Sequence, residues 1–143
     1  MAMATGRLQR ELAWGDCDPA GIIFYPTYYR WMDAATWSLL GQGGWPATRV
    51  RQEHVTIPLV HAACEFLASP TFGDTVEIRS VVSRWGRSSF SLAHEFFLPS
   101  QDKLLARGTE SRVWCRYADG PGTPLISEPL PADLRAALGA PAA

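Results

Sequence analysis

A carboxylate on a short, sharply turning loop stands directly before an expected helix. Asp18 is followed by Pro19 and Gly21, which force a turn because proline fixes φ and glycine admits conformations closed to other residues. Tyr25-Pro26 then has the form of a helix entrance, since proline suits the first helical position. The free N–H groups of a first helical turn carry partial positive charge and can polarise a carbonyl oxygen. A carboxylate and an electropositive helix end that face one cavity suit acyl transfer.

The residues around this loop form a long and specific pattern. It reads Gly15-Asp16-Cys17-Asp18-Pro19-Ala20-Gly21-Ile22, then Tyr25-Pro26, Tyr28 and Arg30-Trp31-Met32-Asp33-Ala34-Ala35. This pattern resembles the hotdog-fold acyl-CoA thioesterases of the 4-hydroxybenzoyl-CoA thioesterase type. A thinner likeness continues through Trp45, Ile57-Pro58-Leu59-Val60 and Trp85-Gly86-Arg87-Ser88-Ser89-Phe90. The resemblance implies an enzyme that hydrolyses acyl-CoA thioesters.

Length, charge and cysteine usage agree with such an enzyme. The 143 residues fit one domain, 1–143, and 47% of them are hydrophobic. A net charge of −1 gives no basic field for nucleic acid, so local charges must hold an anionic ligand. Cys17, Cys64 and Cys115 form no CxxC pair, which favours free thiols and a cytoplasmic location. The chain lacks a signal-like apolar start at Met1 to Arg10 and an apolar run of the roughly 20 residues that span a bilayer.

The hydrophobic periodicity predicts an α+β domain. A first strand is expected at Arg7 to Trp14, and a helix at Pro26 to about Leu40, where apolar residues recur every three or four positions. Gly41, Gly43 and Gly44 are expected to end this helix. The remaining expected elements are a short helical turn in 45–53, strands at 57–68, 75–85, 88–98 and 103–117, an irregular tail from 118 to 131, and a last helical turn at 132–138. One helix followed by sequential strands implies an antiparallel sheet with the helix on one face. The resemblance refines this to the hotdog fold, with about five strands wrapped around one long helix.

The resemblance also assigns catalytic roles. It implies that Asp18 attacks the thioester or activates the water that does, and it leaves that choice open. It implies that the backbone N–H of Tyr25 polarises the thioester carbonyl. The alternative for a loop aspartate is that its side chain caps the following turn. Asp16, two residues earlier, is expected to be structural and to hold the loop by hydrogen bonds.

The acyl pocket follows from the same resemblance. Asp33 aligns with an acid that contacts an aromatic hydroxyl, and the alternative for it is a solvated helix face. Trp45, Ile57, Pro58 and Leu59 align with residues that line the pocket, and the alternative for them is core packing. Position 57 departs from the family pattern, because isoleucine stands where threonine is expected. The lost hydroxyl makes the pocket more apolar.

For the coenzyme A end, Arg87, Ser88 and Ser89 occupy a turn where the family carries a more basic cluster for nucleotide phosphates. Gly86 and Ser88 replace two of three expected cations, and Arg84 is close enough to compensate. The alternative is a solvated hairpin turn. No metal site is expected, because the histidines and cysteines lack ligand spacing. No cofactor is expected either, since coenzyme A is part of the substrate.

Three functions remain open on the sequence. The first is hydrolysis of an aromatic, hydroxybenzoyl-type acyl-CoA, the second is hydrolysis of short- or medium-chain aliphatic acyl-CoAs, and the third is a non-catalytic acyl-CoA binding module. The resemblance implies a homodimer or homotetramer with a site shared between chains. Aromatic residues in both alternation phases of the later strands predict exposed interface patches. These residues are Trp85, Phe90, Phe96, Phe97 and Trp114.

Overall fold

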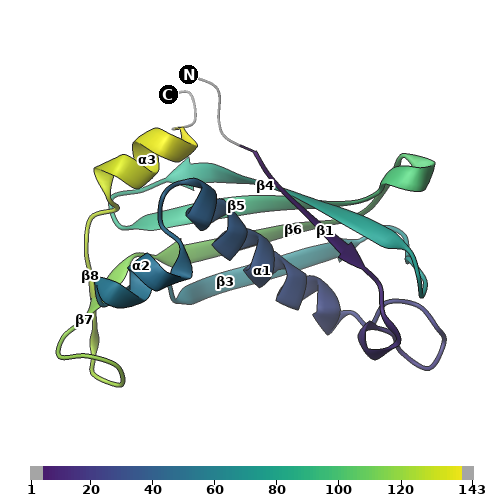
Figure 1. Ribbon diagram of the computed structural model, residues 1–143, viewed down its shortest axis with the longest axis horizontal. Helices are drawn as coiled ribbons and strands as arrows, with labels where there is room; N and C mark the ends of the chain where they lie inside the picture. Colours follow the sequence, from purple (N-terminus) through teal and green to yellow (C-terminus); the bar gives the residue numbers. More distant parts are fainter. Residues whose placement is uncertain (1–4, 140–143) are drawn as a thin grey trace.

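A five-stranded antiparallel sheet covered on one face by helices forms the body of the molecule (Figure 1). A computed structural model describes residues 5–139, so residues 1–4 and 140–143 of the expected domain lie outside it. The strand order is β1-β4-β5-β6-β3. The strands are β1 (Gly6–Glu11), β3 (Leu59–Phe66), β4 (Thr75–Trp85), β5 (Ser89–Leu98) and β6 (Lys103–Val113). The hotdog architecture and the α+β class expected from the sequence are confirmed.

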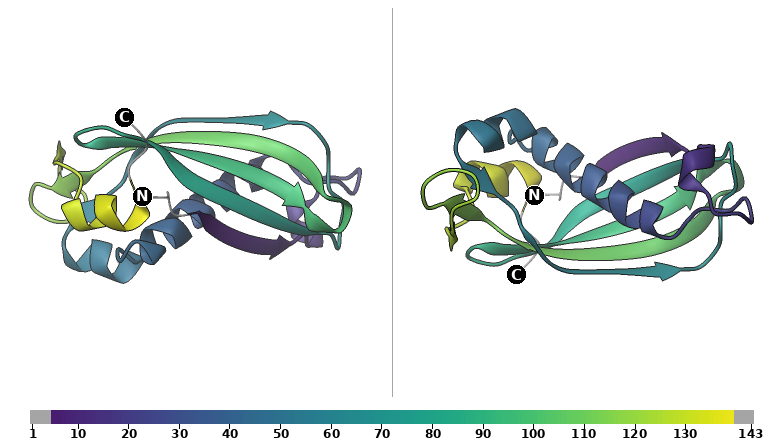
Figure 2. Two further views of the ribbon diagram at one scale, coloured as in Figure 1. Left: turned by 90° about the horizontal axis from the view of Figure 1, so that it is seen from above. Right: turned by 90° about the horizontal axis from the view of Figure 1, so that it is seen from below.

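Helix α1 (Pro26–Gln42) lies across one face of this sheet, as both views of Figure 2 show. Proline occupies the first helical position as expected, and the apolar positions spaced by three and four residues are buried. Met32 of the helix packs against Gly108 of β6, where a Cβ atom would lie 2.6 Å from the Met32 sulfur. The helix runs two residues beyond the expected end before Gly44 adopts a left-handed φ of 87°. Within residues 5–139 no helix is both long and apolar enough to cross a membrane.

Alternation along the strands places the core between helix and sheet. On β5, Phe90, Leu92 and Phe96 face α1 and are at most 1% exposed, and His94 shares this inward phase at 1%. The residues at 91, 93 and 95 face outward. Helices α2 (Ala47–Gln52) and α3 (Ala132–Leu138) extend the covering layer at one end of the sheet (Figure 2). The outer face of the sheet carries no helix within the described residues.

A second, small sheet corrects the expectation of one strand over 103–117. The strand ends at Val113, because the backbone N–H of Trp114 donates to Ser88 and its ring turns inward against Trp45. Residues 115–117 then form β7 between β2 (Val55–Thr56) and β8 (Leu125–Ser127). Strand β8 lies in the tail that was expected to be irregular, whereas α3 matches the expected helical turn.

The aromatic residues expected at an interface are mostly internal. Phe90, Phe96 and Trp114 are buried against the helices at no more than 2% exposure. Trp85 is half-buried beneath the Arg135 guanidinium, and Phe97 lies beneath that of Arg79. The inference of exposed patches from these five residues was therefore wrong. One group of exposed apolar side chains lies on edge strand β3 and just beyond it, at Leu59, Val60, Phe66 and Leu67, and another lies around the Asp18 loop, at Trp14, Phe24 and Tyr25.

Candidate active site

The Asp18 side chain sits in a tight turn that occupies only one of its oxygens. Oδ1 accepts the N–H of Ala20 at 2.8 Å, and the Asp18 carbonyl accepts the N–H of Gly21 at 2.9 Å. Gly21 has a φ of 80°, which explains the need for glycine there. Oδ2 accepts no hydrogen bond from residues 5–139. The turn-capping contact exists, and it leaves one partly exposed carboxylate oxygen available for chemistry.

Asp16 fixes the same loop onto the start of α1. Its Oδ2 accepts the N–H of Ala13 at 3.0 Å, and its Oδ1 pairs with Arg30 at 2.8 Å. Its carbonyl accepts the N–H of Phe24 at 2.8 Å and the hydroxyl of Thr27 at 3.1 Å. The structural role expected of Asp16 is confirmed.

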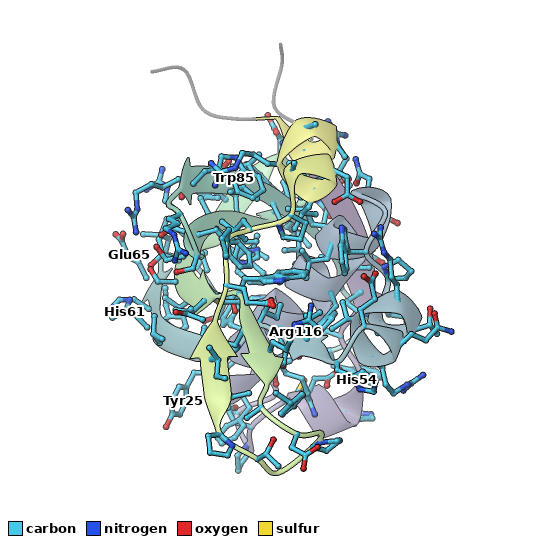
Figure 3. All side chains as sticks on the ribbon, turned by 90° about the vertical axis from the view of Figure 1, so that its left-hand side faces the viewer. Tyr25, His54, His61, Glu65, Trp85 and Arg116 are labelled. Atoms are coloured by element: carbon cyan, nitrogen blue, oxygen red, sulfur yellow. The ribbon has the colours of Figure 1, made fainter. Side chains whose placement is uncertain are left out.

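Tyr25 precedes the first turn of α1 with helical dihedral angles, φ −55° and ψ −33°. Its backbone N–H has no acceptor among the described residues, as befits an orphan donor at a helix start. Its side chain is 60% exposed, points away from the body of the molecule in Figure 3, and lies 6.5 Å from the Phe66 ring, centroid to centroid. A pocket of about 310 Å³ adjoins this helix start. Its lining residues are Gly15, Phe24, Pro26, Thr27 and Arg30.

Asp33 lies on the exposed side of α1 and is tied to the sheet by Arg112. Its side chain is 58% exposed, and its Oδ1 accepts from Arg112 Nη2 at 2.9 Å. Arg112 Nη1 donates to the carbonyl of Ile57 at 3.0 Å. Two residues assigned to the acyl pocket on sequence grounds, 24 positions apart, are therefore joined by one guanidinium.

A buried carboxylate supports Arg112. Glu110 Oε2 accepts from Arg112 Nη2 at 2.6 Å, and its Oε1 contacts His94 Nε2 at 2.7 Å and the Thr36 hydroxyl. Burial alone would raise the pKa of Glu110, but hydrogen bonds from His94 and Thr36 and the charge of Arg112 outweigh it and lower the pKa to about 2. Glu110 is therefore ionised throughout the neutral range.

The other pocket candidates are mainly internal. Trp45 is 5% exposed, packs edge-on against Trp114, and donates its indole N–H to Asp133 at 3.2 Å. Ile57 is 2% exposed and belongs to the same buried cluster. Pro58 is partly buried and Leu59 is 48% exposed. Of these four residues, Leu59 is thus the most open to a ligand within one chain.

Arg87, Ser88 and Ser89 lie far from the Asp18 loop. Strand β1 ends beside Thr75, the first residue of β4, and leads into the Asp18 loop. The turn at 86–88 follows Trp85, the last residue of β4, so the length of β4 separates the two regions. Figure 1 shows the loop and the turn at opposite ends of the sheet. Carbonyls of the turn accept from Leu130 and Arg135, which packs it against α3. The Arg87 side chain is exposed and forms no ion pair within residues 5–139. The two regions do not form one site within one chain.

Sequence reasoning missed the support beneath Asp33. Glu110 and Arg112 stand two residues apart in the inward phase of β6, where apolar side chains are expected. That pair of buried charges was the available signal. Their partners His94 and Thr36 are brought to them by strand register and helix docking, which single-sequence patterns do not specify.

Comparisons with known proteins match this architecture. A family model described as the thioesterase-like superfamily matches residues 12–138. The 4-hydroxybenzoyl-CoA thioesterase of Pseudomonas sp. strain CBS-3 is 33% identical over 132 residues, covering 88% of this chain and 92% of that protein.

Solved structures give the same result. A gentisyl-coenzyme A thioesterase is 35% identical with a TM-score of 0.80, covering 90% of this chain and 98% of that one. A 4-hydroxybenzoyl-CoA thioesterase mutant complexed with 4-hydroxybenzoyl-CoA is 30% identical with a TM-score of 0.83, covering 94% and 99%. The chain therefore belongs to the thioesterase-like superfamily, among the hotdog-fold enzymes that hydrolyse acyl-CoA thioesters.

Proposed function

We propose that the protein hydrolyses a hydroxylated aromatic acyl-CoA to the free acid and coenzyme A. The observation that carries this proposal is the Asp33 carboxylate, which Arg112 holds beside the Ile57 segment while its other oxygen accepts no hydrogen bond from residues 5–139. A fixed, exposed carboxylate is a strong acceptor for a phenolic O–H. The relatives named above for 4-hydroxybenzoyl and gentisyl substrates, which both carry ring hydroxyls, support the same substrate class.

Asp18 and Tyr25 supply the chemistry in this proposal. The Tyr25 N–H stabilises negative charge on the thioester carbonyl oxygen, and a pre-aligned donor of this kind contributes about 3 kcal/mol. Asp18 acts with its free Oδ2, either on the carbonyl carbon or on a water molecule. A thiolate leaves readily, so a single carboxylate with one polarising donor suffices, and no Ser-His-Asp triad is needed.

The proposed enzyme is a homo-oligomer whose site is shared between chains. Tyr25 contacts Phe66 at one end of β3, whereas Ile57 precedes Leu59 at the other end. The first and last of the eight residues of β3 are seven steps of roughly 3.3 Å apart, a separation of about 23 Å. Antiparallel pairing of β3 with β3 of a second copy would bring the Tyr25 end of one chain to the Ile57 end of its partner. The pairing would also close an open sheet edge and cover Leu59, Val60, Phe66 and Leu67.

Coenzyme A binding at Arg87, Ser88 and Ser89 is part of the proposal. The turn is too far from Asp18 within one chain. The proposal therefore requires a dimer or a tetramer in which a different copy supplies this turn to the site. The exposed guanidinium of Arg87 is available to a phosphate. The three cysteines are free, which fits the expected cytoplasmic setting.

An aliphatic acyl-CoA is the second candidate substrate. Isoleucine at position 57, where a threonine was expected, favours an apolar acyl group. A panel of aryl- and alkyl-CoA thioesters, assayed for thiol release, distinguishes the two. The proposal predicts a kcat/KM for 4-hydroxybenzoyl-CoA at least tenfold above those for benzoyl-CoA and hexanoyl-CoA, the ratio expected of about 1.4 kcal/mol. Equal or higher values for hexanoyl-CoA would reject the aromatic assignment.

A further inference from the structure

A chain of polar side chains crosses the buried face of the sheet and ends at Asp33. Ser80 Oγ contacts His94 Nδ1 at 2.6 Å, and His94 Nε2 contacts Glu110 at 2.7 Å. Glu110 binds Arg112 at 2.6 Å, and Arg112 binds Asp33 at 2.9 Å. The exposed fraction of the side chain is 0% at His94, 3% at Glu110, 6% at Arg112 and 58% at Asp33. Asp33 is thus the solvent-accessible end of an otherwise buried row of polar side chains.

Stability is a poor explanation for these charges. A buried ion pair costs desolvation, and well-packed apolar residues in its place are often as stabilising or more so. Arg112 adds to this cost, because its buried Nε has no hydrogen-bond partner among the described residues. The exposed Asp33 carboxylate at the end of this row offers a better explanation for the buried charges.

The geometry of Arg112 fits the task of holding Asp33. Nη2 donates to both Glu110 and Asp33, while Nη1 donates to the Ile57 carbonyl. A planar guanidinium anchored by Glu110 and the Ile57 carbonyl leaves little freedom to the Asp33 carboxylate that it binds. Oδ2 of Asp33 accepts no hydrogen bond from residues 5–139 and remains available to a ligand.

We propose that Arg112, anchored by Glu110 and the Ile57 carbonyl, is the positioning residue that fixes Asp33 to select acyl groups bearing a ring hydroxyl. This inference rests on the proposed function and specifies how the same site recognises its substrate. The guanidinium holds Oδ1, and Oδ2 accepts the phenolic O–H. An acyl group ending in a carboxylate is rejected, because it would face the charge of Asp33.

Binding of two thioethers that cannot be hydrolysed tests this proposal. The probes are 4-hydroxybenzyl-CoA and benzyl-CoA, and calorimetry measures the ratio of their dissociation constants. The wild-type protein is expected to bind the hydroxylated probe about tenfold more tightly, as one hydrogen bond to a charged acceptor allows. Arg112→Gln is expected to reduce this ratio to within about twofold of unity while the affinity for benzyl-CoA changes less than about threefold.

Two further variants keep the test decisive. Ser91→Ala removes a hydrogen bond to Ser111 in the outward phase of β5 and β6 and touches no member of the Arg112 network, so it should leave the ratio unchanged. Should Arg112→Gln fail to fold, Glu110→Gln replaces it, because it removes the charge that anchors Arg112 and should lower the ratio at least threefold, about 0.65 kcal/mol.

The contrary outcomes are distinct. No preference in the wild-type protein, or a full preference retained by the folded Arg112 or Glu110 variant, overturns the inference. If Arg112 had a purely structural role, its substitution would weaken the binding of both probes equally and leave the ratio of their dissociation constants unchanged. Hydrolysis of 4-hydroxybenzoyl-CoA is measured on the same preparations. Turnover without probe preference overturns only the positioning role, whereas an Arg112-dependent preference without turnover supports that role and rejects the proposed function.

Discussion

At the level of single residues, the geometry of Asp18 is compatible with both roles that the sequence presents as alternatives, turn capping and the proposed catalysis. Its Oδ1 caps the turn through the N–H of Ala20, and its Oδ2 stays unengaged by the described residues. Asp16, by contrast, has both oxygens bound, one to Ala13 and one to Arg30. Asp18 therefore keeps a carboxylate oxygen without a partner among the described residues, whereas Asp16 does not. This difference supports Asp18 as the reactive acid of the loop.

Asp33→Ala is expected to reduce hydrolysis of hydroxybenzoyl-CoA far more than that of benzoyl-CoA. A hydrogen bond to a charged acceptor contributes about 1.5–3 kcal/mol, so the ratio of the two kcat/KM values should fall at least tenfold. Asp119→Ala is a matched control, since Asp119 is an exposed acid on the loop after β7. Equal losses on both substrates would leave Asp33 with a structural or surface role.

At the level of elements, the loop before α1 depends on Asp16 for its position. Asp16→Ala removes the acceptor for Ala13 N–H and is expected to destabilise the fold by about 1 kcal/mol. It should also lower kcat about tenfold, because Asp18 and the Tyr25 N–H would lose their fixed relation.

The control for this variant is Arg30→Gln, which removes only the exposed ion pair with Asp16. Such pairs contribute less than about 1 kcal/mol, so this variant should keep nearly full activity. Thermal unfolding and steady-state kinetics provide the measurements. An active Asp16→Ala enzyme would show that the loop needs no such anchor.

The Glu110 network should give the fold an acid-sensitive component. The folded-state pKa of Glu110, about 2, lies below its ordinary value of 4.5, so the unfolded chain takes up a proton first as the pH falls. The stability that Glu110 contributes is complete above about pH 4.5 and is lost between there and about pH 2. Glu110→Gln should abolish this part of the pH dependence and cost about 3 kcal/mol near neutrality, because it breaks a buried pair.

Unfolding midpoints of both proteins, measured from pH 6 to pH 2.5, check this prediction. Glu95→Gln is a suitable control, since Glu95 is an exposed acid on the outer face of β5. If the unfolding midpoints of the wild-type protein and Glu110→Gln changed in parallel with pH, the lowered pKa of Glu110 would be contradicted.

Local patterns predicted most elements but not where the long last strand divides. Periodicity and proline placed the start of α1, and glycine and proline boundaries placed β4 and α3. Residues 113–117 are rich in side chains that favour strands, so only tertiary contacts of Trp114 reveal that the strand ends. For the proposed site, the motif predicted Asp18 and Asp33. The role proposed for Arg112 rests on its contacts with Asp33, Glu110 and the Ile57 carbonyl, which no local pattern encodes.

At the level of the whole molecule, the two halves of the proposed site lie at opposite ends of β3. His61 and Glu65 project from the same side of that strand in Figure 3, as alternation requires. The backbone edge of β3 has no neighbour within the described chain. A second copy paired along this edge would join the Asp18 loop of one chain to the Ile57 segment of the other.

Hybrid oligomers test this sharing. Asp18→Asn removes the carboxylate, and Leu59→Arg places a charge where the acyl group is expected, so each variant alone should be inactive. After mixed refolding in equal amounts, half of the dimers are hybrids with one intact site of two, which gives about a quarter of wild-type activity. Separately refolded proteins mixed without exchange serve as the control. No recovery in verified hybrids would place the whole site within one chain.

The most direct measurement of the central claim compares the wild-type enzyme with Asp18→Asn on 4-hydroxybenzoyl-CoA. Asparagine keeps the shape and the oxygen that caps the turn while it removes the charge. Catalysis by Asp18 predicts that kcat falls at least a hundredfold, about 2.7 kcal/mol of transition-state stabilisation, with the unfolding midpoint and the affinity for the thioether probe nearly unchanged. A variant that retains more than about a tenth of wild-type turnover, a change under roughly 1.4 kcal/mol, would contradict the assignment of Asp18 as nucleophile or general base.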